Sequence, residues 1–402
     1  MYERLVSPRR AKTWRLSPPL NAPLIIISPE FPPRRGGVAD HTVELARGLS
    51  ARRDVTVLTS LSGALENGFR VSPTVSNWQS PRAVLNAIRQ LPVGAEILWQ
   101  YVPQMYGRGG FNPGLATIIK ALSQAGRAQC LIAHEIEAPL SWWPHRMFYA
   151  LAHRYQWRQI LRYVDVIGIS TEAWLDDYRR RAPAWQTKLF LAPSPSNIAV
   201  VATSPDQRQV WRRKNGLESA TQVIACFGNL NWPEQFAWIR TAWIEAQTTL
   251  RRVGLVAVGD LAISAAVPGG LKPLFKLAGY LSAAEVSAVL QAADVLALPY
   301  VDGVAERRTT FMAGLSHGCA VITTFGHSTG LTLRQGKFFW GVEVDQKQRF
   351  VDRLCGLLAD DALRAKLGQA ARETYEQRYA WPKLIETIEE KLARIRRLRP
   401  VP

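Results

Sequence analysis

The sequence is poor in cysteine and has no long apolar run, and each absence excludes a class of protein. Its four cysteines lie far apart and form no CxxC pair, which argues against a disulfide framework or a zinc site. No stretch of about 18 apolar residues occurs, so no membrane-spanning helix is expected. The basic residues near the start are not followed by an apolar run of signal-peptide length. We therefore expect a cytoplasmic protein.

Acidic residues are scarce relative to basic ones. The chain has 50 Lys and Arg against 32 Asp and Glu, a net charge of +18, which indicates an acidic partner. No zinc-finger, RRM or basic-zipper pattern accompanies the basic residues, so no specific nucleic-acid binding is expected. Peripheral contact with the inner face of an anionic membrane fits the charge better, because each Lys or Arg near anionic lipid contributes roughly 1 kcal/mol.

One segment combines aromatic and basic side chains. Residues 142–148 read WWPHRMF and follow an expected strand at 129–133. Tryptophan and arginine together are typical of surfaces that lie at a membrane interface. Packing of these tryptophans in the protein interior is the alternative, since the chain has 14 of them.

Short apolar strands alternate with helical stretches along most of the 402 residues. Residues 24–28 (LIIIS) form a β-branched run, as expected for a strand that is buried on both faces. Further strands are expected at 54–59, 96–99, 129–133, 164–170, 188–192, 222–227, 253–258, 295–299 and 320–323. Helices are expected at 39–50, 81–91, 112–126, 172–181, 233–247, 284–292, 309–317 and 361–399. This α/β alternation predicts parallel sheets with helices on both faces.

The alternation stops once, which divides the chain into two domains. Residues 197–220 are polar and are expected to form an irregular linker. We expect a first doubly wound, Rossmann-like domain over residues 1–200 and a second over 201–382. A helix over 383–402 is expected to pack back on the first domain.

Glycines and one asparagine follow three expected strands, at the position where such sheets bind their ligands. They are Gly36 and Gly37 after the first strand, and Gly228, Asn229 and Gly259 after two strands of the second domain. A glycine pair just before a helix lets the backbone approach an anion closely. The alternatives are a flexible turn at the first position and ordinary strand-ending turns at the others.

Two further loops carry ionisable side chains. His134 directly follows the strand at 129–133, where it can hydrogen-bond a substrate hydroxyl; a structural histidine is the alternative. The other loop opens a helix with Glu306, Arg307, Arg308, Thr309 and Thr310. Arginines bind phosphate in a bidentate manner and a carboxylate accepts from hydroxyls, so this group suits a diphosphate and a sugar. A capped, salt-bridged surface helix is the alternative.

Taken in order, these segments resemble the retaining family-4 (group 1) glycosyltransferases, whose GT-B fold has two doubly wound, Rossmann-like domains facing across a cleft. The segments are GGVADHTVELARGL, WQYVPQMYGRGG, AHE, DVIGISTEAW, GYLSAAEVSAVLQAADVLALPY and ERRTTFMAGLSHGCAVITT. The resemblance implies a nucleotide-sugar donor on the C-terminal domain. It also implies a glycan, lipid-linked or small-molecule acceptor on the N-terminal domain, as in polysaccharide biosynthesis.

The family reaction is a metal-independent hexosyl transfer with retention of anomeric configuration. The resemblance therefore implies no metal and no cofactor, because the nucleotide sugar is a co-substrate. It places His134 near the transferred sugar and makes it a catalytic candidate, and Glu306, from the loop that opens a helix, is the second candidate. The resemblance implies Gly36, Gly37, Tyr280, Leu281, Thr309 and Thr310 as donor-binding residues, and the loops described above add Gly228, Asn229, Gly259, Arg307 and Arg308. Among these, Tyr280 and Leu281 match the segment that lines the base pocket.

The sequence departs from the family pattern at the donor site. The family has two glutamates separated by seven residues, but Ala305 and Ala313 occupy those positions, and Glu306 is offset by one. The family's Arg and Lys after the strand at 222–227 are also missing. Either Arg307 and Arg308 replace those cations, or the chain is a catalytically silent homologue that serves as a binding or scaffold subunit in glycan assembly.

Overall fold

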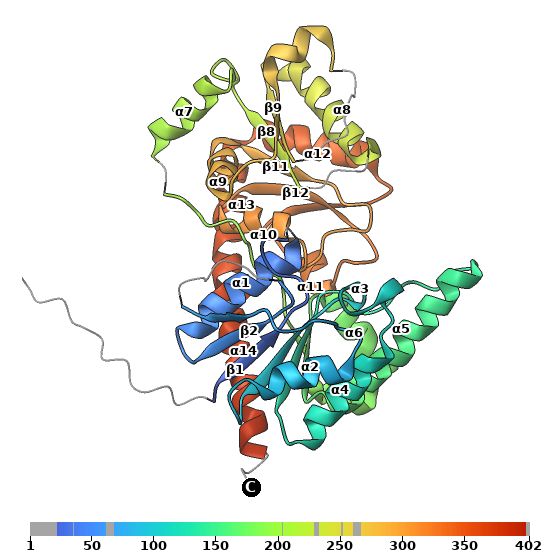
Figure 1. The fold of residues 1–402 in the computed structure, drawn as a ribbon. Coiled ribbons are helices and arrows are strands. Elements are labelled where there is room, and N and C mark those ends of the chain that lie inside the picture. The colour runs from blue at the N-terminus through green and yellow to red at the C-terminus, as the bar shows by residue number, and fades with distance from the viewer. Residues whose placement is uncertain are drawn as a thin grey trace, which may run out of the picture.

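The computed structural model describes residues 22–34, 36–61, 68–202, 204–228, 233–250, 252–259 and 267–398. They form two lobes, and each lobe is a parallel sheet with helices packed on both faces (Figure 1). This architecture confirms the expected pair of doubly wound domains. None of the described helices combines the length and the hydropathy that crossing a membrane requires.

The first lobe is built on a seven-stranded sheet of order β3-β2-β1-β4-β5-β6-β7. Its strands are β1 (Leu24–Ile27), β2 (Val55–Leu58), β3 (Arg70–Ser72), β4 (Glu96–Tyr101), β5 (Gln129–Ala133), β6 (Val166–Ile169) and β7 (Leu189–Leu191). The central strand β1 pairs in parallel with β2 on one side and β4 on the other, and all four of its residues are buried. The strand order reverses between β1 and β4, which makes this the topological switch point.

The helices of the first lobe cover both faces of its sheet. They are α1 (Gly37–Ser50), α2 (Pro81–Arg89), α3 (Pro103–Tyr106), α4 (Pro113–Gln124), α5 (Pro144–Tyr163) and α6 (Glu172–Arg181). A proline opens each of α2 to α5, where its missing N–H would have no helical partner in any case.

The second lobe is built on a six-stranded sheet of order β10-β9-β8-β11-β12-β13. Its strands are β8 (Val223–Phe227), β9 (Gly254–Val258), β10 (Phe275–Gly279), β11 (Val295–Leu298), β12 (Ala320–Phe325) and β13 (Trp340–Glu343). Its helices are α8 (Pro233–Thr249), α9 (Ala283–Ala292), α10 (Thr309–Ser316), α11 (Leu331–Gln335), α12 (Lys347–Ala359) and α13 (Asp361–Thr374). The strand order reverses between β8 and β11, so the second switch point lies there.

The segment between the two sheets contains a helix. The expectation that residues 197–220 are irregular is wrong over α7 (Pro205–Lys214). This helix begins with a capping box, because the Ser204 hydroxyl accepts from the Gln207 N–H and the Gln207 side chain accepts from the Ser204 N–H at 2.8 Å. The pattern Ser-Pro-Asp-Gln was the sequence signal for this helix.

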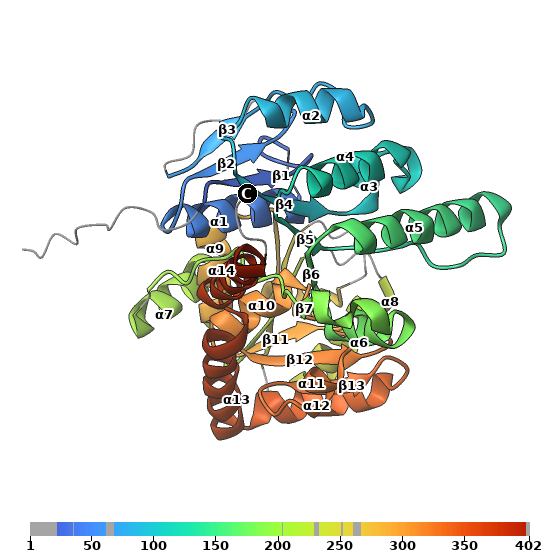
Figure 2. The same ribbon diagram turned by 90° about the horizontal axis from the view of Figure 1, so that it is seen from below.

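The last helix, α14 (Trp381–Leu398), crosses from the second lobe back to the first (Figure 1). It packs against α1, and its apolar face joins one core of the first lobe through Leu384, Ile385, Ile388, Leu392 and Ile395. Buried Arg53 pairs with Glu389 of α14 at 3.3 Å, which adds a polar contact to the apolar one. Figure 2 shows α14 beside α1 from below.

Candidate functional site

A cavity of about 260 Å³ lies at the switch point of the second sheet, between the ends of β8 and β11. Open parallel sheets bind their ligands at this position. The cavity is lined by Phe227, Gly228, Gln235, Pro299, Tyr300, Val301, Asp302, Arg307, Arg308, Thr309 and Thr310. The structure therefore brings together five of the candidate donor-binding residues, namely Gly228, Arg307, Arg308, Thr309 and Thr310.

Two arginines supply positive charge to this cavity and are held in place from two sides. Arg307 Nη2 lies 3.1 Å from Asp302 Oδ2, and Arg308 pairs with the other oxygen of the same carboxylate. The Arg307 guanidinium lies 5.0 Å from the ring of Trp174, and that of Arg308 lies 4.8 Å from the ring of Tyr300. Fixed guanidinium groups of this kind are suited to bidentate recognition of phosphate.

The two cations are not fully compensated. The Nε atoms of Arg307 and Arg308 are buried without a hydrogen-bond partner, and one carboxylate, Asp302, serves both side chains. Burial and the neighbouring charge of Arg308 lower the pKa of Arg307, because both disfavour its charged form. An anion in the cavity would relieve this deficit of negative charge.

The cavity also receives the amino-terminal end of α10. Arg308 precedes this helix and no side chain caps it, so its first N–H groups and its dipole favour an anion. The Thr310 hydroxyl forms a 2.7 Å hydrogen bond with the Tyr300 hydroxyl on the cavity wall. Gln235 contributes a buried side-chain oxygen that has no hydrogen-bond partner. The wall thus offers both cationic and neutral polar groups.

Gly228 closes the cavity by direct contact with α10. Its φ is 117°, in the region that favours glycine, and a Cβ there would lie 2.8 Å from Thr310 Cγ2.

We expect Gly228→Ala to lower the free energy of unfolding by roughly 1–3 kcal/mol and to displace the Thr310 side chain. Denaturant unfolding measures this loss. Gly269→Ala is the control, because its Cβ would meet no atom within 4 Å, and an equal loss in both variants would contradict the close contact.

His134 lies at the carboxyl end of β5 in the first lobe. Its Nε2 is 2.6 Å from Gln100 Oε1, and its ring is 4.6 Å from that of His41. Burial lowers the pKa of His134 to about 4, so the imidazole is neutral at pH 7. Because the amide oxygen of Gln100 can only accept, we assign the proton to Nε2, which leaves Nδ1 as an acceptor.

His41 joins this group although the sequence did not single it out. It lies in the first turns of α1 and is 4% exposed, and neither of its ring nitrogens has a hydrogen-bond partner. Burial, followed by the proximity of His134, lowers its pKa. The ring of Trp381 of α14 also packs against it, with ring centroids 5.0 Å apart. The only sequence signal was its place in the stretch GGVADH.

The glycine pair opens α1 near the segment that connects the lobes. A Cβ on Gly36 would lie 3.1 Å from the Glu30 carboxylate, whereas a Cβ on Gly37 would lie in open space. Asp40, in the first turn of α1, accepts a 3.0 Å hydrogen bond from Asn197 of the connecting segment. Neither glycine lines the cavity in the second lobe.

Glu306 is buried between the two lobes. Its Oε2 accepts a hydrogen bond from the Glu172 N–H of α6 at 3.1 Å, and its carbonyl accepts from the Ser194 N–H at 3.0 Å. Burial raises the pKa of Glu306 to about 7, and its Oε1 has no hydrogen-bond partner. The side chain thus holds the start of α6 in the first lobe and does not line the cavity beside Arg307.

The contact between the lobes is reciprocal. Glu172, at the start of α6, accepts hydrogen bonds from the N–H and the hydroxyl of Thr332 in the second lobe, at 2.7 and 2.6 Å. Each lobe therefore supplies a glutamate that accepts from the amino-terminal end of a helix in the other lobe. The sequence did not identify Glu172, because its partners lie more than a hundred residues away.

Of the remaining candidate residues, those that the structure describes do not line the cavity. Tyr280 is 78% exposed after β10, and Leu281 packs against the core of the second lobe. Gly259 has a φ of 119°, and its backbone packs directly against that of Gly228, which does line the cavity. Asn229 lies outside the described residues.

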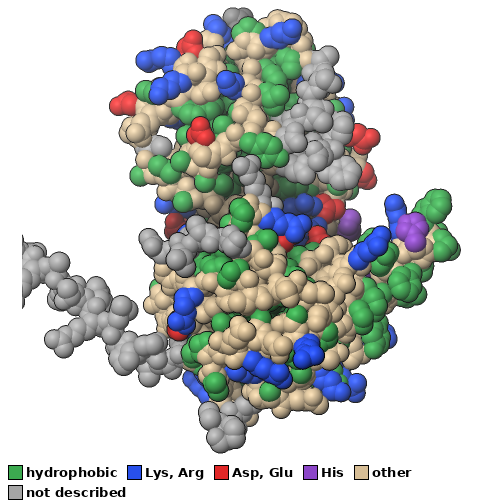
Figure 3. All heavy atoms as spheres, viewed as in Figure 1, with side chains coloured by type: hydrophobic (Ala, Val, Ile, Leu, Met, Phe, Trp, Pro, Cys, Tyr) green, Lys and Arg blue, Asp and Glu red, His purple; other side chains and the backbone are tan. Residues whose placement is uncertain are grey.

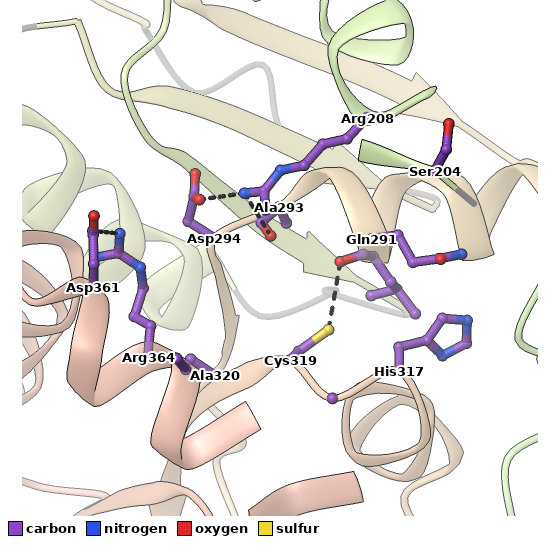
Figure 4. A pocket seen from close by; sticks show the side chains of 13 residues that line it. Ser204, Arg208, Gln291, Ala293, Asp294, His317, Cys319, Ala320, Asp361 and Arg364 are labelled. Atoms are coloured by element: carbon purple, nitrogen blue, oxygen red, sulfur yellow. Dashed lines mark hydrogen bonds and ion pairs between the residues drawn. The ribbon is translucent and has the colours of Figure 1, made fainter. Parts of the chain in front are cut away.

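A larger cavity of about 580 Å³ lies at the opposite edge of the second sheet, where β11 and β12 begin. Its charged side chains pair with one another: Figure 4 shows Arg208 reaching toward Asp294 and Arg364 toward Asp361. The charges of this cavity are already paired, and the cavity lies at the amino ends of the strands, whereas open parallel sheets bind ligands beyond the carboxyl ends. We therefore do not assign this cavity to the donor. In the described ranges no group of three or more His, Cys, Asp or Glu side chains is arranged to hold a metal ion.

Several solved structures have a fold similar to that of this chain. The chain is similar to Anabaena Alr3699/HepE in complex with UDP and glucose, at 15% identity and a TM-score of 0.67, covering 93% of this chain and 100% of the other. It is also similar to sucrose-phosphate synthase from Thermosynechococcus elongatus, at 14% identity and a TM-score of 0.68, covering 94% and 100%. A third similar structure is that of WaaG, a glycosyltransferase involved in lipopolysaccharide biosynthesis. It is 16% identical, with a TM-score of 0.60, and the match covers 92% of this chain and 99% of the other.

A comparison with protein families found one match, which lies in the second lobe. Residues 221–360 match the family model described as glycosyl transferases group 1. No curated protein matches the sequence significantly. The matched segment includes the switch point of the second sheet and every residue that lines the 260 Å³ cavity. Residues 221–360 are therefore similar to the group 1 glycosyl transferases, and the chain as a whole has the GT-B fold.

Proposed function

We propose that this protein transfers a sugar from a nucleoside diphosphate donor to a hydroxyl acceptor with retention of anomeric configuration. The observation that carries the proposal is the cavity at the switch point of the second sheet, because it combines Arg307, Arg308 and the uncapped start of α10 within the segment that matches the group 1 family. Similar structures contain UDP or UDP-glucose, which makes UDP the first nucleotide to test.

The cavity suits the diphosphate part of such a donor. Its volume of about 260 Å³ lies below the roughly 300–1,000 Å³ of sites that enclose a whole drug-sized ligand. We infer that Arg307 and Arg308 take the place of the missing family cations, and that Thr309 and Thr310 add hydroxyl and N–H donors. The nucleoside and the sugar would extend beyond the cavity.

We assign the acceptor to the first lobe. His134 is neutral and presents Nδ1 as an acceptor, so it suits a sugar hydroxyl better than a phosphate. Transfer would break the bond between the anomeric carbon and the diphosphate and form a bond to the acceptor oxygen. The acceptor proton would pass to the leaving phosphate, and no metal is required in this scheme. Glu306 would act by holding the lobes together.

A melting assay with UDP, GDP, ADP and their glucose conjugates tests the donor part of the proposal. We expect at least one nucleotide diphosphate to raise Tm, because a ligand that binds only the folded state stabilises it. The absence of a shift with every compound at millimolar concentration would contradict the assignment.

A second function is a catalytically silent subunit that binds a nucleotide or a partner in glycan assembly. Two positions favour it, because Ala305 and Ala313 replace the family glutamates and both are fully buried, without a carboxylate that could contact a donor. Slow hydrolysis of a bound sugar nucleotide, followed by release of free sugar, would exclude this alternative. Donor binding without hydrolysis or transfer to any acceptor would support it.

A further inference from the structure

An exposed hydrophobic surface surrounds the amino-terminal half of α5. Of the 15 large hydrophobic side chains that the described part of the chain exposes, six lie between residues 140 and 155. They are Leu140, Trp142, Trp143, Phe148, Leu151 and Tyr155, which we call the α5 surface. Trp142 is fully exposed, so the alternative of interior packing is wrong for this residue. Clustered exposure of this kind marks an interaction site.

The helix presents this surface away from the body of the protein. The amino-terminal end of α5 projects from the first lobe in both ribbon views (Figures 1 and 2). Phe148, Leu151 and Tyr155 follow one another at spacings of three and four, so they share one helical face. Exposed Arg158 and Arg162 continue the same face. The other face packs on the lobe through Trp157 and six further buried residues of the helix.

The charge of α5 has one sign. The helix contains four arginines and no Asp or Glu. Arg154 pairs with Glu137 at 3.2 Å, but within the described residues no carboxylate lies at ion-pair distance from Arg146, Arg158 or Arg162. Figure 3 shows hydrophobic side chains together with basic and histidine side chains on this projection. The surface thus combines aromatic groups with uncompensated positive charge.

We propose that the α5 surface binds the surface of an anionic lipid bilayer. Tryptophan and tyrosine favour the interface between headgroups and acyl chains, and arginines beside them bind lipid phosphates. Exposed aromatic side chains enter the interface and neighbouring basic ones bind anionic headgroups, so such a surface lies against the bilayer and does not cross it. A second copy of this chain fits less well, because pairing two α5 surfaces would bring their arginines together.

The location of this surface also bears on the acceptor. This part of the inference rests on the proposed function. Residues 134–143 connect His134 at the end of β5 directly to the start of α5. A bilayer that touches α5 therefore lies on the side of the first lobe, to which we assign the acceptor. This arrangement points to a lipid-linked acceptor. Binding of the bilayer itself requires neither a donor nor catalysis.

Vesicle co-sedimentation of the full chain tests the proposal. We expect binding to vesicles of phosphatidylglycerol and phosphatidylcholine, little binding to phosphatidylcholine alone, and weaker binding at high salt. The triple variant Trp142→Ala, Trp143→Ala and Phe148→Ala should lower the partition coefficient by on the order of a hundredfold. Arg158→Gln and Arg162→Gln should each lower it about fivefold, which corresponds to ~1 kcal/mol.

A matched control separates this surface from general hydrophobicity. Val93→Ala with Val210→Ala removes exposed apolar groups elsewhere and should bind vesicles as the wild type does. Wild-type protein that stays in the supernatant with anionic vesicles, or a triple variant that binds normally, would overturn the proposal. So would a dimer in light scattering that the triple variant abolishes, because a second copy would then cover the surface. Vesicle binding without nucleotide binding would contradict only the proposed function.

Discussion

Replacing Arg307 and Arg308 by alanine is expected to abolish measurable binding of UDP, with each single substitution weakening it roughly 10- to 100-fold. A charge-assisted hydrogen bond to phosphate contributes about 1.5–3 kcal/mol, and each 1.4 kcal/mol is a factor of ten in Kd. Both side chains line the cavity and are 24% and 27% exposed, so both are available to an anion. Isothermal titration calorimetry with UDP measures the effect.

Two further variants separate recognition of phosphate from a general effect on folding. Arg308→Lys keeps the charge but loses the planar fork, so its Kd should fall between those of the wild type and Arg308→Ala. Arg353→Ala is the matched control, because Arg353 also stacks on an aromatic ring, Trp340, at 5.3 Å and does not line the cavity. If both alanine variants at positions 307 and 308 bind UDP like the wild type, these arginines do not replace the family cations.

Replacing Glu306 by glutamine is expected to stabilise the protein at pH 8 and to change its stability little at pH 4.5. Burial raises the pKa of Glu306 to about 7 from an ordinary 4.5, so the folded state favours the protonated carboxyl. The resulting stability is complete below pH 4.5 and is lost as pH rises through 7. The difference at pH 8 amounts to about 3 kcal/mol, because one pKa unit corresponds to ~1.4 kcal/mol.

Glutamine retains the oxygen that accepts from the Glu172 N–H and removes the buried charge. Urea unfolding at the two pH values measures the effect, and Glu218→Gln, at an exposed glutamate, provides the matched control. An equal gain or loss for Glu306→Gln at both pH values would show that its carboxyl does not titrate between the lobes in this range.

The fold was largely predictable because its signals are local. The run at 24–28 has no polar residue before Ser28, so it could only be a central strand, and the structure buries every residue of β1. Helix α6 has the predicted bounds, since Thr171 caps it and arginines fill its last turn. Strands β10 and β13 were missed because their residues are mostly half-buried and mix glycine and charged residues with apolar ones.

Helix α5 was missed for a different reason. Its exposed face mixes Phe148, Leu151 and Tyr155 with arginines, where a surface helix normally has only polar residues, so the usual alternation of apolar and polar positions is absent. The expectation of an aromatic, basic surface over residues 142–148 did not depend on recognising the helix. In the structure Trp142 and Trp143 are both exposed, so both side chains belong to that surface.

The candidate site was predictable only where its residues are neighbours in sequence. Arg307, Arg308, Thr309 and Thr310 are contiguous, and Gly228 joins them because adjacent strands of a parallel sheet end at the same edge. Glu306 belongs to the same stretch, yet its side chain turns toward the other lobe. That direction depends on a helix 134 residues away, and no local spacing reveals it.

A crystal structure of the protein soaked with UDP is the most direct test of the central claim. We expect the diphosphate at the start of α10, within hydrogen-bond distance of Arg307 or Arg308 and of the Thr309 or Thr310 hydroxyl. A diphosphate bound at another place, such as the cavity beside Arg208 and Arg364, would contradict the claim that these arginines form the donor site.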